Sequence, residues 1–236
     1  MGEIIKQNHS VVIAADVDNL DYLKTLVSET QDVDGIGGYK LGSVLTTYYG
    51  LPSVISYVRN FTDLPIIYDP QKGGTDTPNL GKNLAKAFKT AKANAVILFP
   101  LAGPQTQDKW IEAMQQEELE ILIGGEMTHP QFKRSEGGYI ADDALDGIYI
   151  RAANSGVDNF VLPGNKIDRF THYKNLLDTV VEKPVYYLTG FVRQGGELTE
   201  IRKLAGERWH PIIGRAIYEA RDMKEAAKEI VRKIGL

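Results

Sequence analysis

The chain has 236 residues, 43% of them hydrophobic, a length and apolar share that suit one α/β domain with a sizeable core. A net charge of −4, with both signs mixed, argues against nucleic-acid binding, and the absence of cysteine excludes disulfides, thiolate metal sites and a catalytic thiol. No apolar stretch approaches the roughly 20 residues of a membrane span, and residues 1–6 lack a signal-peptide core, so we expect a cytoplasmic protein without membrane contact.

Short apolar runs alternate with amphipathic stretches along the chain, and eight of these runs resemble parallel strands that are buried on both faces. The predicted strands are residues 11–15, 37–41, 66–69, 95–99, 121–125, 159–162, 185–188 and 211–214. The stretch from Leu80 to Ala91 places its apolar residues on one helical face, and Thr77 with Pro78 predicts the start of that helix. A last amphipathic helix is predicted over residues 223–234.

Eight consecutive βα units without a Pro- or Ser-rich linker predict a single (β/α)8 barrel domain over residues 1–236. An open, doubly wound sheet is the alternative. Polar residues follow most of the predicted strands: Asp16, Lys40, Asp69, Thr128, Asn165, Gln194 and Arg215. Because a barrel gathers the carboxyl ends of its strands around one mouth, these side chains would share a single site, which favours the barrel.

The turn after the third predicted strand carries charges of both signs in Asp69, Lys72 and Asp76. Charges at the end of a buried strand need one another, because an unpaired charge there is costly. Together with Lys40 they would hold a lysine ammonium beside carboxylates, an arrangement that suits the formation and protonation of a carbanion. Two Asp and two Lys are internally balanced, which argues against a metal site. The simpler alternative is a surface loop with an incidental salt bridge.

The last two strands are followed by a candidate phosphate site. Gln194-Gly195-Gly196 comes after the seventh strand, and Gly214-Arg215 closes the eighth. Barrels often hold phosphate at this place with backbone N–H groups that glycine leaves accessible. Arg215 would add a bidentate positive clamp and Gln194 a neutral donor. The sequence therefore predicts a phosphorylated small molecule as the substrate.

These segments resemble the orotidine 5′-monophosphate decarboxylase family over nearly the whole chain. Residues 13–16 and 39–42 look like the ends of that family's first two strands, and residues 126–130 are similar to its Glu-Met-Ser-His-Pro. Residues 156–161 are similar to the entry into its sixth strand, and residues 194–196 and 213–218 look like its phosphate grip. The central motif departs from the family, because Asp69-x-x-Lys72-x-x-x-Asp76 replaces Asp-x-Lys-x-x-Asp and widens the turn by two residues.

The resemblance implies a homodimer that converts orotidine 5′-monophosphate to uridine 5′-monophosphate, in pyrimidine biosynthesis, without metal or cofactor. Lys72 would protonate the carbanion at C6, while Asp69 and Asp76 hold the lysine and crowd the departing carboxylate. Asp76 would serve the site of the partner subunit. Other contacts with the substrate would come from Asp16, Lys40, Thr77, Thr128, Pro163, Gln194, Gly195, Gly214 and Arg215, with Asp16 and Lys40 on the ribose and Thr128 on the pyrimidine edge.

Two further alternatives remain at this point. The first is a sugar-phosphate enzyme resembling 3-keto-gulonate-6-phosphate decarboxylase or hexulose-6-phosphate synthase, which use a magnesium-stabilised enediolate and a Glu at the end of strand two. This chain has Lys40 at that place. The second is a non-catalytic barrel that binds a phosphate ligand, its chemistry lost with the wider turn.

Overall fold

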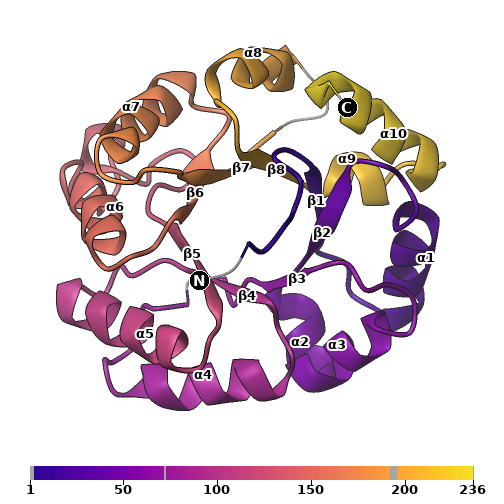
Figure 1. Ribbon diagram of the computed structural model, residues 1–236, viewed down its shortest axis with the longest axis horizontal. Coiled ribbons are helices and arrows are strands. Elements are labelled where there is room, and N and C mark those ends of the chain that lie inside the picture. The colour runs from indigo at the N-terminus through magenta and orange to yellow at the C-terminus, as the bar shows by residue number, and fades with distance from the viewer. Residues whose placement is uncertain (1–2, 72, 192–195, 236) are drawn as a thin grey trace.

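Eight strands pair in chain order, each parallel to the next, and the eighth pairs with the first to close a barrel (Figure 1). This architecture comes from a computed structural model that describes residues 3–71, 73–191 and 196–235. The strands are β1 Val11–Ala15, β2 Ile36–Leu41, β3 Ile66–Tyr68, β4 Ala95–Leu98, β5 Glu120–Gly124, β6 Asn159–Pro163, β7 Val185–Thr189 and β8 Trp209–Ile213. The predicted (β/α)8 barrel is confirmed, and the open sheet is excluded.

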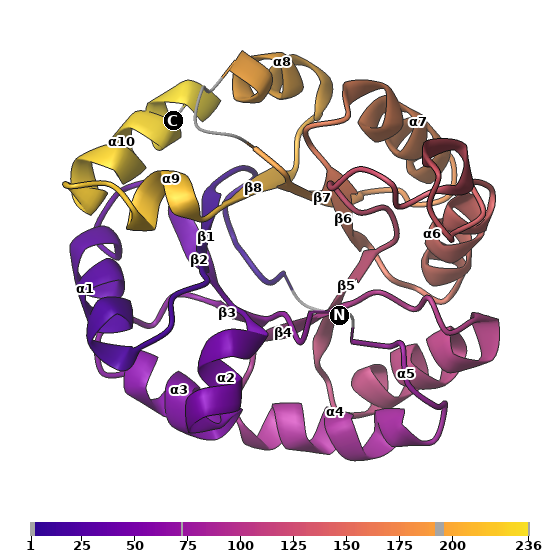
Figure 2. The ribbon, with the colours of Figure 1, turned by 180° about the vertical axis from the view of Figure 1, so that it is seen from behind.

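Helices surround the barrel in a ring, as both views along its axis show (Figures 1 and 2). They are α1 Leu20–Thr30, α2 Ser43–Tyr49, α3 Leu51–Val58, α4 Leu80–Thr90, α5 Pro104–Gln116, α6 Ala144–Asn154, α7 Ile167–Asp178, α8 Gly196–Leu204, α9 Arg215–Tyr218 and α10 Met223–Ile234, with a short 3₁₀ turn at Arg134–Glu136. None of the helices in the described ranges combines the length and apolarity needed to cross a membrane.

The predicted start of the helix after β3 is wrong by a few residues. Helix α4 begins at Leu80 with Asn79 as its N-cap residue, and Pro78 lies in the preceding turn. The carbonyl of Thr77 accepts hydrogen bonds from the backbone of Leu80 and from the indole of Trp110, which hold Thr77 in that turn. The last helix matches its prediction, because Asp222 caps its first turn and Gly235, at a φ of 85°, ends it.

The core has two layers, as the alternation of side chains along a strand requires. One layer lies between the strands and the helices and includes Ile13, Tyr39 and Ile66. The other fills the inside of the barrel and consists of Ile4, Ile5, Val12, Ala14, Ile67, Ala95, Ile97, Phe99, Leu122, Val161, Val185, Tyr187 and Ile212. Both strand faces are therefore buried, which explains why the strands read as continuous apolar runs.

The segment before β1 closes the end of the barrel at which the strands begin. Its trace runs across the inside of the ring of strands (Figures 1 and 2). Ile4 and Ile5 pack with the interior side chains, and the carbonyl of Asn8 accepts a hydrogen bond of 3.0 Å from the backbone of Trp209. With this end filled by the chain itself, the mouth at the carboxyl ends of the strands is the place left for a site.

Candidate active site

A cavity of about 610 Å³ opens at the carboxyl ends of the strands. Seven of the residues predicted from the sequence line it together: Asp16, Lys40, Asp69, Thr128, Asn165, Gly214 and Arg215. They come from β1, β2, β3, β5, β6 and β8 or from the turns that follow them. The barrel thus brings residues that lie up to about 200 positions apart in sequence into one site, as the pattern of strand ends predicts.

Strand register explains why the first three of these residues meet. Ala14 of β1 is paired with Lys40 of β2, and Lys40 with Ile67 of β3, and Ala14 and Ile67 belong to the interior layer. Asp16 and Asp69 lie two residues further along their strands, so each points to the same inner side one step nearer the mouth. Lys40 is therefore flanked by a carboxylate from each neighbouring strand.

We call Lys40, Asp16 and Asp69 the lysine cluster. The ammonium Nζ of Lys40 lies 2.9 Å from Oδ1 of Asp16 and 3.3 Å from Oδ2 of Asp69. The Lys40 side chain is buried, whereas that of Asp16 is 36% exposed at the cavity. Burial acts to lower the pKa of Lys40, but the charges of Asp69 and Asp16 outweigh it and raise that pKa above its usual value. The cluster thus holds a permanently charged ammonium next to an exposed carboxylate.

The turn after β3 fixes Asp69 from its other side. The backbone N–H of Gln71 donates to Oδ1 of Asp69 at 2.9 Å, while Lys40 takes Oδ2. Gln71 has a φ of 49°, in the left-handed region that residues other than glycine seldom adopt. Its side chain lines the cavity. The sequence analysis did not select Gln71, because no residue pattern marks a left-handed glutamine in a turn.

The wall formed by β8 and α9 combines a closely packed glycine, Gly214, with the positive charge of the next residue, Arg215. A Cβ on Gly214 would lie 3.2 Å from the ring of Tyr218 and 3.3 Å from the carbonyl oxygen of Ala14. A side chain here would be tightly packed against both neighbours, whereas glycine leaves the backbone accessible. Exposed Arg215 follows and lines the cavity together with Tyr218. A guanidinium beside an accessible backbone turn suits an anionic group of a ligand.

The wall formed by the ends of β5, β6 and β7 is packed around a glycine. The amide Nδ2 of Asn165 donates to the carbonyl of Thr128 at 3.3 Å. A Cβ on Gly190 would approach Oδ1 of Asn165 to 2.6 Å and Cγ2 of Thr128 to 2.7 Å. Gly190 has a φ of 93°, so both its conformation and its surroundings require glycine. These contacts fix Thr128, whose side chain faces the cavity.

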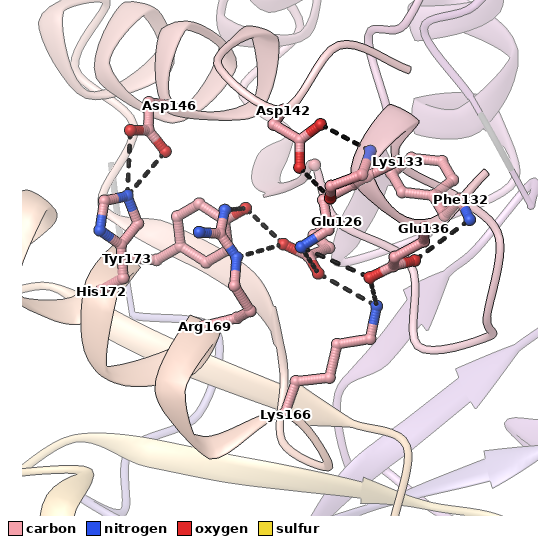
Figure 3. Close-up of polar contacts among 12 residues, drawn as sticks. Glu126, Phe132, Lys133, Glu136, Asp142, Asp146, Lys166, Arg169, His172 and Tyr173 are labelled. Carbon is pink, nitrogen blue, oxygen red and sulfur yellow. Dashed lines mark hydrogen bonds and ion pairs between the residues drawn. The ribbon is translucent and has the colours of Figure 1, made fainter. Parts of the chain in front are cut away.

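Beside this wall lies a second charged group, which we call the glutamate cluster: Glu126, Lys133, Glu136, Lys166, Arg169 and Tyr173 (Figure 3). Its central residue, Glu126, is among the residues that line the cavity. Oε1 of Glu126 is 3.1 Å from the ammonium groups of both Lys133 and Lys166. Its Oε2 accepts from Nε of Arg169 at 2.8 Å and from the hydroxyl of Tyr173 at 2.6 Å. Both carboxylate oxygens are thus fully engaged, and the cluster ties the loop after β5 to the start of α7.

The electrostatics of Glu126 follow from this surrounding. The side chain is completely buried, which on its own would raise its pKa. Hydrogen bonds from Tyr173, Arg169, Lys166 and Lys133 outweigh burial and lower the pKa of Glu126 from 4.5 to about 2. In the sequence Glu126 stands out only as part of a motif. Its buried cluster has no sequence signal, because its partners lie on other elements and follow no local spacing.

The sequence model of the Orotidine 5′-phosphate decarboxylase / HUMPS family matches residues 9–230. The chain belongs to this family. Among curated relatives, the orotidine 5′-phosphate decarboxylase of Pyrococcus furiosus is 31% identical over 229 residues, covering 95% of this chain and 97% of that protein. The orotidine 5′-phosphate decarboxylase of Methanosarcina mazei is 27% identical, covering 98% of this chain and 97% of that protein.

Solved structures of decarboxylases in the family have the same fold. The crystal structure of orotidine 5′-phosphate decarboxylase from Pyrococcus horikoshii aligns with a TM-score of 0.79 at 25% identity, covering 95% of this chain and 98% of that one. That of orotidine 5′-monophosphate decarboxylase from Methanocaldococcus jannaschii, complexed with the inhibitor BMP, aligns with a TM-score of 0.83 at 21% identity, covering 96% and 99%. The barrel is thus that of the orotidine 5′-phosphate decarboxylase family from end to end.

The remaining residues that family resemblance assigned to the site fall into two groups. Lys72, Gln194 and Gly195 lie outside the described residues. Asp76, Thr77 and Pro163 are described, but they are not among the described residues that line the cavity. Asp76 and Thr77 are exposed on the turn before α4, and Pro163 is buried at the end of β6. Within the described ranges, no group of three or more His, Cys, Asp or Glu side chains could hold a metal ion.

Proposed function

We propose that the chain decarboxylates orotidine 5′-monophosphate to uridine 5′-monophosphate, a step of pyrimidine biosynthesis, without metal or cofactor. The observation that carries the proposal is the lysine cluster, in which Lys40 lies between Asp16 and Asp69 in the same cavity as Arg215. This cavity can receive a molecule that carries a phosphate at one end and sugar hydroxyls further along, where the lysine cluster lies. Membership of the decarboxylase family and the names of the relatives support the same substrate.

The proposed reaction breaks one carbon–carbon bond and moves one proton. The bond between C6 of the pyrimidine and its carboxylate breaks, CO2 leaves, and the electron pair stays on C6. The ammonium of Lys72 then gives its proton to C6. Asp69, held between Lys40 and the Gln71 backbone, keeps its negative charge near the departing carboxylate. Stabilisation of the carbanion by a positioned ammonium is the larger expected contribution to the rate.

Binding of the substrate is distributed around the cavity. Gly214 and Arg215, at the start of α9, line the cavity and would hold the phosphate, assisted by Gln194 and Gly195. Asp16 and Lys40 would bind the ribose hydroxyls. The side chain of Thr128, fixed by its contacts with Asn165 and Gly190, would meet the polar edge of the pyrimidine. Pro163, buried at the end of β6, would act only by supporting this wall.

We further propose a homodimer in which Asp76 and Thr77 serve the cavity of the partner subunit. Both residues are exposed, and neither is among the described residues that line their own cavity. Helix α2, whose first residue follows Gly42 beside the turn of Gln71, offers exposed Val44, Tyr48 and Tyr49 for such a contact. A cytoplasmic enzyme is expected, because a substrate with charged phosphate and carboxylate groups does not cross a bilayer.

The sugar-phosphate alternative needs a divalent cation near the end of β2. Lys40 occupies that place with a raised pKa, so its positive charge would repel the cation. The relatives named above are orotidine 5′-phosphate decarboxylases, which supports the nucleotide substrate again. The barrel of this chain is therefore assigned to the nucleotide rather than to the sugar-phosphate branch of the family.

The proposal is tested by following the ultraviolet absorbance of orotidine 5′-monophosphate mixed with the purified protein. We expect loss of the substrate's absorbance at an unchanged rate in EDTA. Lys72→Ala should abolish turnover, while Lys82→Ala, which alters an exposed lysine of α4, should not. Binding without CO2 release would identify a non-catalytic barrel instead, and inhibition by EDTA would favour the sugar-phosphate chemistry.

Shared sites have a separate test. Lys72→Ala and Asp76→Ala proteins, each inactive alone, are mixed under conditions that exchange subunits. In the mixed dimer one cavity keeps both Lys72 and the partner's Asp76, so a fraction of the activity should return. Proven exchange without any recovery would contradict the lending of Asp76 across the interface.

A further inference from the structure

The turn after β3 directs a side chain into the cavity to which the family resemblance gives no role. Gln71 lies two residues after Asp69, is exposed, and lines the cavity. Its φ of 49° is unusual for a residue with a side chain. Such conformations persist where the surrounding structure requires them, and they concentrate at binding sites. The conformation and place of Gln71 both indicate a side chain that contacts a ligand.

The backbone of Gln71 is held by the lysine cluster. Its N–H donates to Oδ1 of Asp69 at 2.9 Å, and the other oxygen of Asp69 is 3.3 Å from Nζ of Lys40. This bond to the N–H two residues later makes a short turn closed by an aspartate side chain. The position of the Gln71 side chain is thus set by the same contacts that order Asp69.

The amide of Gln71 and the carboxylate of Asp16 both lie next to Gly42. A Cβ placed on Gly42 would be 2.5 Å from Oδ1 of Asp16 and 3.5 Å from Nε2 of Gln71. Both polar groups therefore approach the same backbone position, and the missing side chain of Gly42 gives them the room to do so. Asp16 is 36% exposed there, so its carboxylate is accessible to a ligand.

Three kinds of polar group thus meet at one side of the cavity: a carboxylate that accepts, an ammonium that donates, and an amide that can do both. This set matches the hydroxyls of a sugar, each of which donates one hydrogen bond and accepts others. We propose that Gln71 is a ribose-binding residue, whose amide hydrogen-bonds one hydroxyl of the substrate beside Asp16 and Lys40. The inference rests on the proposed function, because that function supplies a ribonucleotide.

The test compares ligands that differ by one hydroxyl. Dissociation constants for uridine 5′-monophosphate and its 2′-deoxy and 3′-deoxy analogues are measured by calorimetry for the natural protein and for Gln71→Gly. Glycine keeps both the left-handed backbone and the backbone N–H that holds Asp69, so the change removes only the side chain with its carboxamide. We expect Gln71→Gly to weaken binding of uridine 5′-monophosphate about fivefold, the effect of one neutral hydrogen bond. Binding of the analogue that lacks the contacted hydroxyl should not change.

Gln131→Gly is the matched control. Gln131 is also an exposed glutamine with a left-handed backbone, at a φ of 60°, and it is not among the described residues that line the cavity. The control should leave the affinities for all three ligands as they are. A second variant, Gln71→Asn, also tolerates the left-handed conformation but withdraws the amide by one methylene, so it should behave like Gln71→Gly.

The outcomes separate this inference from the proposed function. Equal weakening of all three ligands by Gln71→Gly would overturn the ribose contact, and so would an unchanged affinity for uridine 5′-monophosphate. In either case decarboxylation by the natural protein would leave the proposed function standing. Selective loss in a protein that releases no CO2 would support the contact and contradict the catalytic assignment. A natural protein that binds none of the three ligands would overturn the ribose contact, while the decarboxylation assay would decide the proposed function separately.

Discussion

The two charge clusters at the barrel mouth have central groups of opposite charge. The lysine cluster places one ammonium between two carboxylates, and the glutamate cluster places one carboxylate between three cations and a phenol. Asp16 of the first cluster is 36% exposed at the cavity, whereas the central glutamate of the second is completely buried. Both clusters lie beside the same cavity, yet only the first presents an exposed carboxylate to a ligand.

This difference shows that a buried ion pair at a cavity is not by itself a sign of catalysis. A central group whose hydrogen-bonding positions are all taken by the protein can only stabilise the structure around it. The glutamate cluster joins the loop after β5 to α7, and so fixes the segment that contains Thr128. In the lysine cluster the carboxylate of Asp16 is exposed to the cavity, and this makes the cluster the candidate for chemistry.

The largest expected effect is on stability, from Glu126→Leu. This change leaves Lys133, Lys166 and Arg169 with one fewer carboxylate in a buried place, and breaking such a network typically costs about 3–5 kcal/mol. The free energy of unfolding, measured in urea, should fall by that amount. Glu112→Gln is the control, because Glu112 pairs with Lys109 on the surface and its loss should not be measurable. Equal stability of the two variants would refute a structural role for Glu126.

Lys40→Met should have the reverse profile, with a large effect on activity and a smaller one on stability. It removes the central cation but leaves partly exposed carboxylates that water can solvate. We expect kcat/KM to fall by about 10²–10³, the usual result of removing one positioned electrostatic group. Steady-state kinetics and urea unfolding of the same preparation would check both halves. A variant that unfolds early but turns over normally when folded would reverse the roles assigned to the clusters.

The loss of stability in acid should show the contribution of the glutamate cluster. Glu126 has a pKa of about 2 when folded and 4.5 otherwise, so below pH 4.5 the unfolded chain takes up a proton that the folded protein does not. Glu126 should therefore contribute a loss of about 3 kcal/mol in stability between pH 4.5 and 2, at about 1.4 kcal/mol per pH unit. In Glu126→Gln that part of the decline should be absent. Its persistence there would assign the acid sensitivity to other groups.

A decline in stability that begins at a higher pH is expected from His210. This residue is fully buried, and its Nδ1 lies at a hydrogen-bond distance of 2.9 Å from Oγ of Ser10. Burial lowers the pKa of His210 from 6.5 to about 3, so the unfolded chain binds a proton first as the pH falls below 6.5. The slope between pH 6.5 and 4.5 should therefore disappear in His210→Phe and remain in Glu126→Gln. Because the His210 contribution continues down to about pH 3, thermal unfolding of both variants and the natural protein at half-unit pH steps would separate the two contributions.

The smallest effect is expected at the wall that the glutamate cluster supports. In Gly190→Ala the new Cβ meets Asn165 and Thr128 at contact distances below 3 Å and at a φ of 93°. We expect a raised KM and a loss of about 1–3 kcal/mol in stability. Gly137→Ala has a similar φ of 85° with open space around it, so it carries the backbone strain alone. The difference between the two variants in KM measures how tightly Thr128 must be held.

The sequence predicts the barrel well, because both faces of its strands are buried and the runs from Val11 to Ala15 or Ala95 to Leu98 carry that burial directly. It also predicts that Asp16, Lys40 and Asp69 meet, since a barrel brings the carboxyl ends of its strands together. The predicted start of α4 was wrong, because the indole of Trp110, from the neighbouring helix α5, holds Thr77 in a turn.

Other features of the site had no signal in the sequence. The partners of Glu126 lie 7 to 47 positions away on different elements, so no spacing reveals them. Gln71 acquires its orientation from a carboxylate that is itself ordered by Lys40 on the neighbouring strand. The need for glycine at position 190 arises from side chains of two other loops. Such features depend on tertiary contacts, which only the folded chain makes visible.

The closure of the barrel has a consequence for synthesis on the ribosome. The first strand pairs with the last through Val12 with Ile212 and Ile13 with Ile213, so one edge of β1 has no neighbour until β8 has emerged. At about 5–20 residues per second, the nearly 200 intervening residues take about 10–40 s to translate. During that interval Ile4 and Ile5, which belong inside the finished barrel, are exposed beside an open strand edge. The nascent chain is thus a natural client for chaperones that shield apolar segments.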